Sequence, residues 1–518
     1  MKKTILCAVL CAALLAGCAA PSSAPSQSAA PTPPPSPAPT SAAAAVDTLS
    51  VGHNKALGFN PYIANDNQVL QNSGLVFEKL VEITPLMQLE MRLASEITVE
   101  GATAVIHLRQ DAVFADGTPL TAADVAASIN AARASEMYGG GLAHVTDVQA
   151  GDGTVTVTLS RPDSLFSWMC TLPIMKAAET GAAQPTASGR YTYGGADTLV
   201  KNASSLFWEQ GAPTTIRLVD VGGHDDLVSS LSVGSIDLYS YTREETVGGS
   251  AVTSRSTTFP MNHLVFLGVN SQRTGALQMP AVRQAISAAI DRQTLCQRAF
   301  VGGATPARGA LNPLYPCAVE NQTLSIEGDL AGARALMEQA GYTLSASDGI
   351  WRDANGARLS LRLLVYAGSP LKRSAATQLA DQLAEAGFAV TVEETADFAG
   401  EYVQKVNSGD FDLYIGEVKL YNNMDLSPFL EGGQVSGGIA QDESLAAAYA
   451  ALCQSTDNAG AFEETFAGLL PWIPLCWRNG TLVTSKQITC VTPSISNVFY
   501  SLRPPVTGEA AASSAPPA

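Results

Sequence analysis

Residues 359–392 read LSLRLLVYAGSPLKRSAATQLADQLAEAGFAVTV, and this stretch decides the fold class. Apolar residues alternate with other residues at its beginning and at its end, which is the period of a half-buried β-strand. Between these two runs, Pro370 opens a segment with apolar residues at helical spacing, and Gly387 ends it. A strand, a helix and a second strand in this order predict two parallel strands with a right-handed crossover, and therefore an α/β fold.

A second stretch, residues 216–239, shows the same succession of patterns. It contains an alternating run, a helical pattern around Leu227 and Leu231, and a final run that predicts another strand. The sequence pattern G-x-[I/F]-D-L-Y occurs twice, at residues 234–239 and at residues 409–414. We expect the second copy to be a strand as well. The repetition predicts two lobes of similar design.

Composition excludes one broad class of function. The chain has 518 residues with 30 basic and 47 acidic side chains, a net charge of −17 at pH 7. An acidic protein repels phosphate backbones unless it carries a concentrated basic patch, and the sequence contains none, so we expect no nucleic-acid partner. The length predicts about two to four domain-sized units.

The N-terminal residues predict export and a lipid anchor. A lysine pair precedes an apolar run that ends near Gly17, too short to span a bilayer but typical of a secretory signal. Residues 15–18, LAGC, resemble the lipobox of bacterial lipoproteins, in which the cysteine is acylated and becomes the new N-terminus; the alternative is an ordinary signal peptide with an unrelated cysteine. Residues 19–45 lack charged and large apolar side chains and predict an extended tether. We therefore expect a protein that is lipid-anchored at Cys18 on the extracytoplasmic face of the cell membrane.

The other cysteines and the histidines show no local pattern of reactive or metal-binding chemistry. Six cysteines follow residue 18 without a C-x-x-C pair, and we favour buried free thiols over disulfides. The five histidines are all more than 30 residues apart, so the sequence predicts neither a metal site nor a cofactor.

Motifs of catalysis are likewise missing from the sequence. It has no phosphate-binding G-x-x-x-x-G-K-[ST], no H-E-x-x-H and no G-x-S-x-G. Ser369 and Lys372 match the S-x-x-K of penicillin-binding enzymes, but the partner motifs are absent and Ser369 suits a helix N-cap before Pro370. We expect a binding protein, and keep a lipid-anchored serine hydrolase as an alternative.

Several segments resemble family 5 of the bacterial extracellular solute-binding proteins, the peptide- and nickel-binding components of ABC importers. Residues 113–125, VFADGTPLTAADV, resemble the family segment F-x-D-G-x-P-L-T-A-x-D-V. Residues 186–191, TASGRY, are similar to its G-T-G-P-Y turn, with Arg190 in place of proline. Residues 282–285, VRQA, and 289–292, AIDR, match a further pair of family motifs, and the resemblance extends over about residues 48–502.

This resemblance implies a type II periplasmic-binding-protein fold, in which two α/β lobes close on a solute about a hinge. The crossings between the lobes would be residues 262–270 and 474–478. The implied domains are a signal peptide at 1–17, a lipidated cysteine and linker at 18–46, lobe I at 47–262 plus 476–505, lobe II at 263–475, and a disordered tail at 506–518.

The resemblance also implies a function. The chain would capture short peptides and deliver them to a membrane permease driven by a separate ATPase subunit, acting as a monomer. Within the family a binder of nickel or of metal chelates is the alternative. A receptor or chaperone of this fold without a permease is a further one.

Candidate ligand residues lie in two regions. Residues 416–438 follow the predicted strand 411–415, and ligands bind beyond the carboxyl ends of strands in open α/β sheets. In this loop the resemblance assigns Asp425 to the amino terminus of a peptide, and Tyr421, Asn422 and Asn423 lie beside it; otherwise Asp425 caps a helix or faces solvent. The loop has no histidine, which argues against an imidazole ligand for nickel there. From the other lobe we expect Tyr62, Asn65 and Asn67, and at a crossing Arg478, which would bind a carboxylate or else form an interlobe salt bridge.

Overall fold

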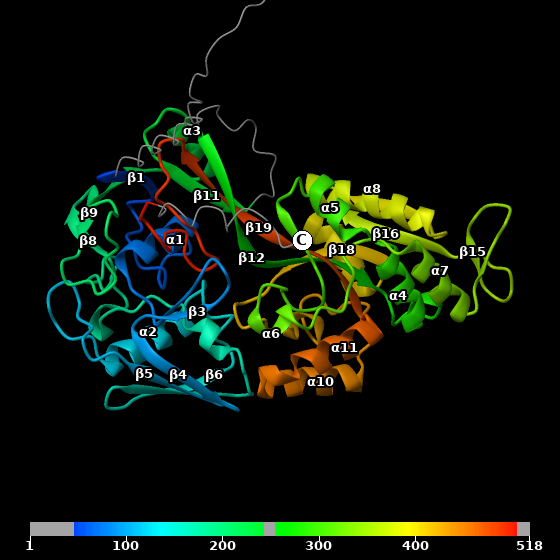
Figure 1. The fold of residues 1–518 in the computed structure, drawn as a ribbon, viewed down its shortest axis with the longest axis horizontal. Coiled ribbons are helices and arrows are strands. Elements are labelled where there is room, and N and C mark those ends of the chain that lie inside the picture. The colour runs from blue at the N-terminus through cyan, green and yellow to red at the C-terminus, as the bar shows by residue number, and fades with distance from the viewer. Residues whose placement is uncertain (1–45, 243–253, 505–518) are drawn as a thin grey trace, which may run out of the picture. The chain divides into compact units, whose positions relative to one another are not determined.

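An eleven-stranded mixed sheet organises the fold (Figure 1). The computed structural model describes residues 46–242 and 254–504, so the predicted signal segment, Cys18, the linker up to residue 45 and the tail from residue 505 lie outside the described residues. The strand order is β17-β16-β18-β12-β19-β11-β1-β10-β9-β8, with β13 (Ala304–Pro306) added along β19. Below, β17, β16 and β18 are called the C-terminal half-sheet, and β11, β1, β10, β9 and β8 the N-terminal half-sheet.

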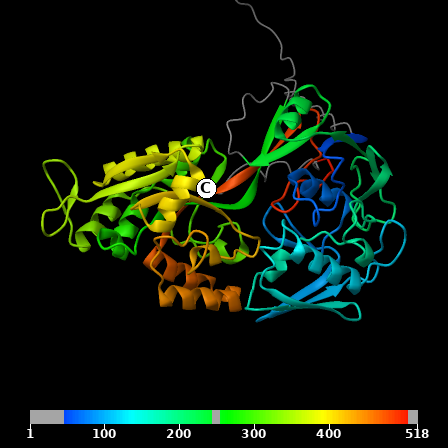
Figure 2. The ribbon, with the colours of Figure 1, turned by 180° about the vertical axis from the view of Figure 1, so that it is seen from behind.

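The C-terminal half-sheet confirms the crossover predicted from residues 359–392. Strand β16 (Ser360–Tyr366) leads through α8 (Pro370–Glu385) to β17 (Ala389–Thr395), which pairs with β16 in parallel. Strand β18 (Leu413–Lys419) is parallel to β16 on its other side. Figure 2 shows these strands and α8 from behind, in yellow.

Helices pack on both sides of this half-sheet. One buried apolar cluster joins α8 to α4 (Pro280–Ala289), α5 (Arg292–Arg298) and α7 (Leu330–Gln339). Another joins α10 (Glu443–Gln454), α11 (Ala459–Leu469) and α6 (Pro316–Val319). Alternate residues of β18 enter the two clusters, as the period of a strand with both faces covered requires.

The N-terminal half-sheet contains the second predicted crossover. Strand β10 (Thr215–Asp220) leads through α3 (His224–Ser232) to β11 (Leu238–Thr242), and β1 (Thr48–His53) lies between the two and is parallel to both. The hairpin β8 (Tyr191–Gly195) and β9 (Thr198–Lys201) completes this edge, and α1 (Asn67–Val76) follows β1.

A separate antiparallel sheet contains the motif at residues 113–125. Its order is β4 (Ala94–Glu100), β5 (Thr103–Leu108), β7 (Thr154–Leu159) and β6 (Val145–Ala150), and α2 (Ala122–Ala134) packs on it. Thr121 and Asp124 form a reciprocal capping box at the start of α2, so this part of the family motif begins a helix. The remaining short elements are β2 (Val81–Ile83), β3 (Leu89–Met91), β14 (Thr343–Leu344), β15 (Trp351–Arg352) and α9 (Val403–Ser408).

Two long strands connect the half-sheets. Strand β12 (Ser254–Val269) pairs with β18 at its end, and β19 (Trp472–Ser485) pairs with β12 along most of its length and with β11 near its own end. The register of β12 on β19 shifts between Pro260 and His263 and again between Val265 and Phe266. The first irregularity is a bulge at Met261 and Asn262, at the point where the chain passes from one half-sheet to the other.

The repeated hexapeptide is not a strand throughout, which corrects the prediction from the sequence. Gly234 and Gly409 both adopt the left-handed conformation, with φ of 74° and 70°, just after helices α3 and α9. The strands begin only at Leu238 and Leu413. The glycines end helices, because a left-handed residue cannot continue a right-handed helix and costs glycine nothing.

The aspartates of the two hexapeptides have the same role in both halves. Asp237 accepts a hydrogen bond from the backbone N–H of Ser50 at 2.7 Å, and Asp412 accepts one from the backbone N–H of Arg362 at 2.8 Å. In each case the acceptor precedes one strand and the donor lies in the neighbouring parallel strand. The repetition is therefore structural.

The buried apolar residues form clusters that combine distant parts of the chain. One cluster takes its members from residues 49–259 and from residues 482–502, whereas another lies within residues 265–476. A third combines residues 83–168 with residues 264–477. By its contacts the chain from residue 44 onward forms one unit, and the lobe boundaries remain a prediction.

The arginines of the VRQA and AIDR motifs are structural. Arg283 is buried and donates to the backbone carbonyls of Leu277 and Leu470, among others. Arg292 is also buried and donates to the carbonyl of Pro474 at 2.8 Å, and burial lowers its pKa to about 10. Each guanidinium ties a helix of the C-terminal half to the segment that enters β19.

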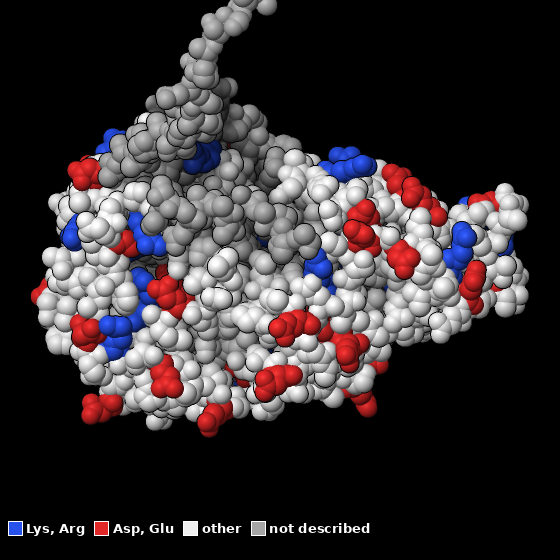
Figure 3. Space-filling view, viewed as in Figure 1, with Lys and Arg blue, Asp and Glu red and all other residues white. Residues whose placement is uncertain are grey.

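Three further features bear on the sequence predictions. The six described cysteines are free thiols, four of them buried, and burial raises the pKa of Cys170 to about 12. Within residues 46–242 and 254–504, none of the helices has the length and apolar character needed to cross a membrane. On the face drawn in Figure 3, basic side chains are scattered among acidic ones.

Candidate functional site

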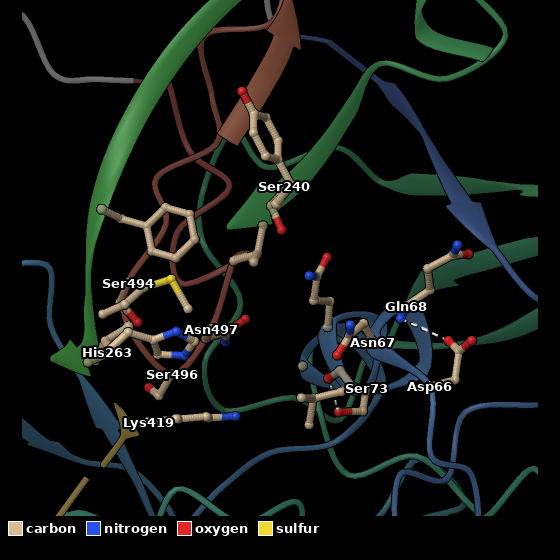
Figure 4. A pocket seen from close by; sticks show the side chains of 18 of the residues that line it. Asp66, Asn67, Gln68, Ser73, Ser240, His263, Lys419, Ser494, Ser496 and Asn497 are labelled. Atoms are coloured by element: carbon tan, nitrogen blue, oxygen red, sulfur yellow. Dashed lines mark hydrogen bonds between the residues drawn. The ribbon is translucent and has the colours of Figure 1, made fainter. Parts of the chain in front are cut away.

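The largest of three cavities compared among the described residues has a volume of about 1000 Å³ and lies where five elements meet; it is called the largest cavity below. Its walls come from α1, from the start of α3, from β11, from β12 near its register shift, and from β18 with the residues that follow it. Residues 494–498, after β19, complete it (Figure 4). The segments after β1 and after β10 thus border the cavity, in agreement with the rule that ligands lie beyond the carboxyl ends of strands.

The walls offer mainly uncharged polar groups and some aromatic surface. Side-chain amides and hydroxyls come from Asn67, Asn262, Asn422, Asn497, Ser240, Ser494 and Ser496. Aromatic surface comes from Tyr138, Tyr241 and Phe259, and the ring of His224 lies 5.8 Å from that of Tyr241. Amides and hydroxyls both donate and accept hydrogen bonds, so this lining suits a ligand with alternating donors and acceptors.

The charged residues of the cavity occupy different walls. Asp66 and Asp225 lie at the starts of α1 and α3, and one oxygen of Asp66 accepts hydrogen bonds from two backbone N–H groups of α1. Lys79 is paired with Glu82 at 3.2 Å. Lys419, the last residue of β18, extends into the cavity (Figure 4).

A cluster of charges on β18, β12 and β19 adjoins this lysine. Glu417 pairs with Lys372 at 2.6 Å and with Arg478 at 3.5 Å, and the imidazole of His263 lies 3.7 Å from it. Burial by itself raises the pKa of Glu417, but the nearby imidazole of His263 and the two cations outweigh it and bring that pKa to about 2. The carboxylate is therefore ionised at any physiological pH. Lys372, the lysine of the S-x-x-K match, is engaged here, and Ser369 makes no capping hydrogen bond with its side chain.

Three of the residues predicted from the sequence line the cavity, namely Asn65, Asn67 and Asn422. The Asn262 amide nitrogen lies 3.3 Å from the Asn422 amide oxygen, so the register shift in β12 and the loop after β18 are in contact. Tyr62 is buried behind this wall, where its hydroxyl donates to the carbonyl of Pro173 and its ring stacks edge-on against Tyr138.

The structure places Asp425 away from the largest cavity. Its carboxylate accepts hydrogen bonds from Arg161 at 2.6 Å, from the Tyr449 hydroxyl at 2.9 Å and from the Ser427 backbone N–H at 2.9 Å. It borders a separate, small cavity. The assignment of Asp425 to a peptide amino terminus remains a prediction, and it requires the aspartate to exchange Arg161 for the ligand.

The other predicted residues also have protein partners. Asn423 is buried and donates to Asp163 at 2.7 Å, and the same carboxylate oxygen lies 3.0 Å from a ring nitrogen of His144. Tyr421 lies so close to Gly140 and Gly141 that a β-carbon would overlap its hydroxyl at Gly140 and its ring at Gly141. Arg478 is 1% exposed beside Glu417. None of these three lines the largest cavity.

One predicted boundary is wrong in a way that matters for the site. The sequence predicts a loop from residue 416, but β18 continues to Lys419 because residues 263–266 of β12 pair with residues 416–419. Glu417, Val418, Lys419 and Leu420 alternate polar and apolar side chains, a short strand signal that the prediction of a loop overlooked. The extension of β18 places Lys419 directly opposite His263 in the ladder.

Several cavity residues were not predicted at all. They are Tyr138, His224, Ser240, Tyr241, Phe259, His263, Lys419 and residues 494–498. The polar run at 494–497, which follows a strand and lacks either period, is the one local signal that could have pointed to the site. Among the described residues there is no group of three or more His, Cys, Asp or Glu side chains placed to hold a metal ion.

Comparison with known proteins identifies the family. The model of bacterial extracellular solute-binding proteins, family 5, matches residues 88–438, which is more than half of the chain. The chain belongs to this family. Family 5 proteins bind solutes and are not enzymes, in agreement with the missing catalytic motifs.

Two relatives match this chain over part of their length. Protein XP55 of Streptomyces lividans is 28% identical over 347 residues, 61% of this chain and 61% of that protein. The glutathione-binding protein GsiB of Salmonella typhimurium is 26% identical over 342 residues, 61% of this chain and 65% of that protein. The chain thus matches less than two thirds of the length of these relatives.

Solved structures confirm the mixed α/β fold of such binding proteins. The unliganded open form of the murein tripeptide-binding protein MppA has a TM-score of 0.69 at 18% identity, covering 88% of this chain and 96% of that one. The oligopeptide-binding protein AppA of Bacillus subtilis, with a nonapeptide, has a TM-score of 0.54 at 17% identity, covering 88% and 97%. NikZ of Campylobacter jejuni, with Ni(L-His), has a TM-score of 0.56 at 18% identity, covering 88% and 96%.

Proposed function

We propose that this family 5 protein is the solute-capturing component of an ABC importer and that its solute is a short peptide held in the largest cavity. The observation that carries the proposal is the lining of this cavity, in which amides and hydroxyls from both half-sheets and their connections surround a space of about 1000 Å³. That volume is at the upper end of the range of about 300–1,000 Å³ for ligand pockets.

The chemistry of the walls supports a peptide. A peptide backbone alternates donors and acceptors, and side-chain amides and hydroxyls can satisfy both without selecting particular side chains. Aromatic surface at Tyr138, Tyr241 and Phe259 can cover apolar side chains of varied shape. The names of AppA, MppA and GsiB connect those proteins with an oligopeptide, a tripeptide and glutathione, which agrees with this chemistry.

Strands β12 and β19 form the hinge in this proposal. They are the long strands that pair in both half-sheets, and the register of β12 on β19 shifts between Pro260 and His263. A bulge of this kind bends the strand locally. Lobe I, at 47–262 plus 476–505, would rotate against lobe II, at 263–475, and peptide would favour the closed state because both lobes touch it there.

The cellular setting is the remaining part of the proposal. The protein acts outside the cytoplasm as a monomer, anchored to the membrane by lipid on Cys18, and passes its solute to a permease driven by a separate ATPase. Globomycin, an inhibitor of lipoprotein signal peptidase, should then cause the unprocessed form to accumulate. Adjacent genes for permeases and ATPases would support the importer role, and their absence would favour a receptor.

A retention experiment tests the choice of solute. The purified protein is mixed with a library of tri- to pentapeptides, separated from free peptide by gel filtration, and the retained peptides are identified by mass spectrometry. We expect intact peptides to be retained by the natural chain and by Asn355→Trp, which changes an exposed turn, but not by Asn67→Trp, which fills the cavity.

The other outcomes are equally informative. Shortened peptides would indicate a hydrolase, and retention of a nickel–histidine chelate but no peptide would favour the chelate binders of the family. Equal retention of peptides by Asn67→Trp would contradict the proposed cavity.

A further inference from the structure

Lys419 differs from Lys79, the other lysine of the cavity. Lys79 has Glu82 as its counter-ion and Asp66 caps α1, whereas Lys419 makes no hydrogen bond or ion pair with any part of the chain that the structure describes. Its side chain is exposed, and Figure 4 shows it extending into the open space of the cavity toward the side where Asn67 and Ser73 lie. A cation in this position is available to a ligand.

The strand geometry fixes where this cation is presented. Lys419 ends β18 and lies opposite His263 of β12, so the two side chains leave the sheet on the same face. His263 also lines the cavity, and its Nε2 atom is buried without a hydrogen-bond partner. Two side chains whose nitrogen atoms can still form hydrogen bonds therefore meet at one place on the cavity wall.

The surroundings favour an anion at this place. Glu417, the nearby acid on the same strand, is already paired with Lys372 and Arg478, so it does not neutralise Lys419. Together these four residues carry three positive charges and one negative charge, in a chain whose net charge is −17. The protein around the amine is dense enough that burial lowers the pKa of Lys419, although water reaches the amine through the cavity. A bound anion would offset this desolvation.

The acidic side chains of the cavity lie elsewhere, on Asp66 and Asp225 at the starts of α1 and α3. In Figure 4 Asp66 and Lys419 stand on opposite sides of the view. A ligand with separated negative and positive ends matches this arrangement better than a ligand with one kind of charge.

We propose that Lys419 is the carboxylate-binding residue of the cavity, and that His263 beside it donates or accepts a second hydrogen bond at the same end of the solute. This inference rests on the proposed function and makes it more specific, because it requires a solute with a carboxylate. The free C-terminus of a peptide provides that group, and so does the amino-acid part of a metal chelate.

A comparison of free-acid and amidated peptides tests the proposal. The retention experiment is repeated with two tripeptide libraries that differ only in a C-terminal carboxylate or carboxamide, in buffer freed of metal by resin rather than by a soluble chelator. A third sample contains the nickel–histidine chelate. The variants are Lys419→Met, Lys419→Arg and the control Lys486→Met, which removes an exposed lysine outside the cavity.

We expect the natural chain and Lys486→Met to retain free-acid peptides at least tenfold better than amides. Lys419→Met should lose that preference, and Lys419→Arg should keep most of it because it preserves the charge. The thermal midpoint without ligand shows whether each variant is folded. Lysine at the surface of a cavity contributes little to packing, so we expect Lys419→Met to fold.

Each alternative result has its own meaning. Equal retention of acids and amides by the natural chain, or an unchanged preference in Lys419→Met, would overturn the role of Lys419 while leaving peptide binding in place. If only the nickel–histidine chelate is retained and Lys419→Met loses it, the carboxylate role stands and the peptide proposal fails. Retention of neither probe by the natural chain would overturn both.

Discussion

Arg161 donates a hydrogen bond to the carboxylate of Asp425 at 2.6 Å, and this pair joins the segment after β7 to the loop after β18. The side chains are 34% and 17% exposed, so the ion pair is partly screened by solvent. The hydroxyl of Tyr449 donates to the same carboxylate at 2.9 Å. The acid that the family resemblance assigns to the ligand is thus already part of a link between residues far apart in the sequence.

Replacement of either partner should cost a modest amount of stability. We expect Asp425→Asn and Arg161→Met each to lower the free energy of unfolding by about 1 kcal/mol, and the double variant to lose less than the sum. Thermal unfolding of the four proteins measures this coupling. If Asp425 also binds the solute, as the resemblance implies, Asp425→Asn alone would lose the upward shift of the thermal midpoint that peptide produces. If peptide raises the thermal midpoint of Asp425→Asn and of Arg161→Met equally, Asp425 has only the structural role.

His53 should make stability fall in mild acid. Burial lowers its pKa to about 4, although Asp66 and Asp220 oppose this, whereas the ordinary value is 6.5. As the pH falls from 6.5 toward 4, the unfolded chain takes up a proton that the folded chain does not, and about 3 kcal/mol of stability is lost. Chemical denaturation at several pH values should show a flatter curve for His53→Gln than for the natural chain. Parallel curves would contradict the buried neutral imidazole.

Glu463 should make the stability of the protein fall as the pH rises. Burial raises its pKa to about 7 from 4.5, even though the backbone N–H groups of Leu311 and Ala310 donate to it. The folded chain then holds a proton that the unfolded chain releases, so stability is lost as the pH rises from 4.5 through 7, by about 3 kcal/mol. Glu463→Gln cannot ionise and should be relatively more stable at pH 8 than at pH 4.5. If the free energies of unfolding of Glu463→Gln and the natural chain differ by the same amount at every pH, Glu463 does not have a raised pKa.

Asp412 should matter more than its exposed neighbour Asp410. Asp412→Ala leaves the backbone N–H of Arg362 without its acceptor, and we expect a loss of about 1–3 kcal/mol. Asp410→Ala removes an ion pair to the same arginine from an aspartate that is 55% exposed, and should cost less than about 1 kcal/mol. Urea denaturation of the two variants provides the comparison, and similar losses would argue against the strand-capping role of the hexapeptide.

The fold could be predicted from the sequence because its signals are local. The alternation in residues 359–366, the proline at the start of α8 and the glycine after it each act within one element, and β16, α8 and β17 follow from them. The same holds for the capping box of Thr121 and Asp124. The hexapeptide was placed correctly but interpreted as a strand, because its glycine and aspartate act on the preceding helix and on a neighbouring strand.

The site could be predicted only in part, because it depends on pairing between distant residues. Asn65 and Asn67 follow a strand end and were found by that rule. Arg161 and Asp425 are 264 positions apart, and nothing local in the sequence indicates that they meet. Lys419 was assigned to a loop because the alternation at residues 417–420 is short, and pairing with residues 263–266 of β12 is what makes it part of the strand.

Small-angle X-ray scattering tests the central claim most directly, namely that a peptide closes the two half-sheets about β12 and β19. The radius of gyration is measured for the ligand-free protein and for the same sample saturated with retained peptides, with occupancy verified by native mass spectrometry. The account predicts a smaller radius of gyration in the saturated sample and no change for Asn67→Trp. An identical radius of gyration at full occupancy would contradict closure about these strands.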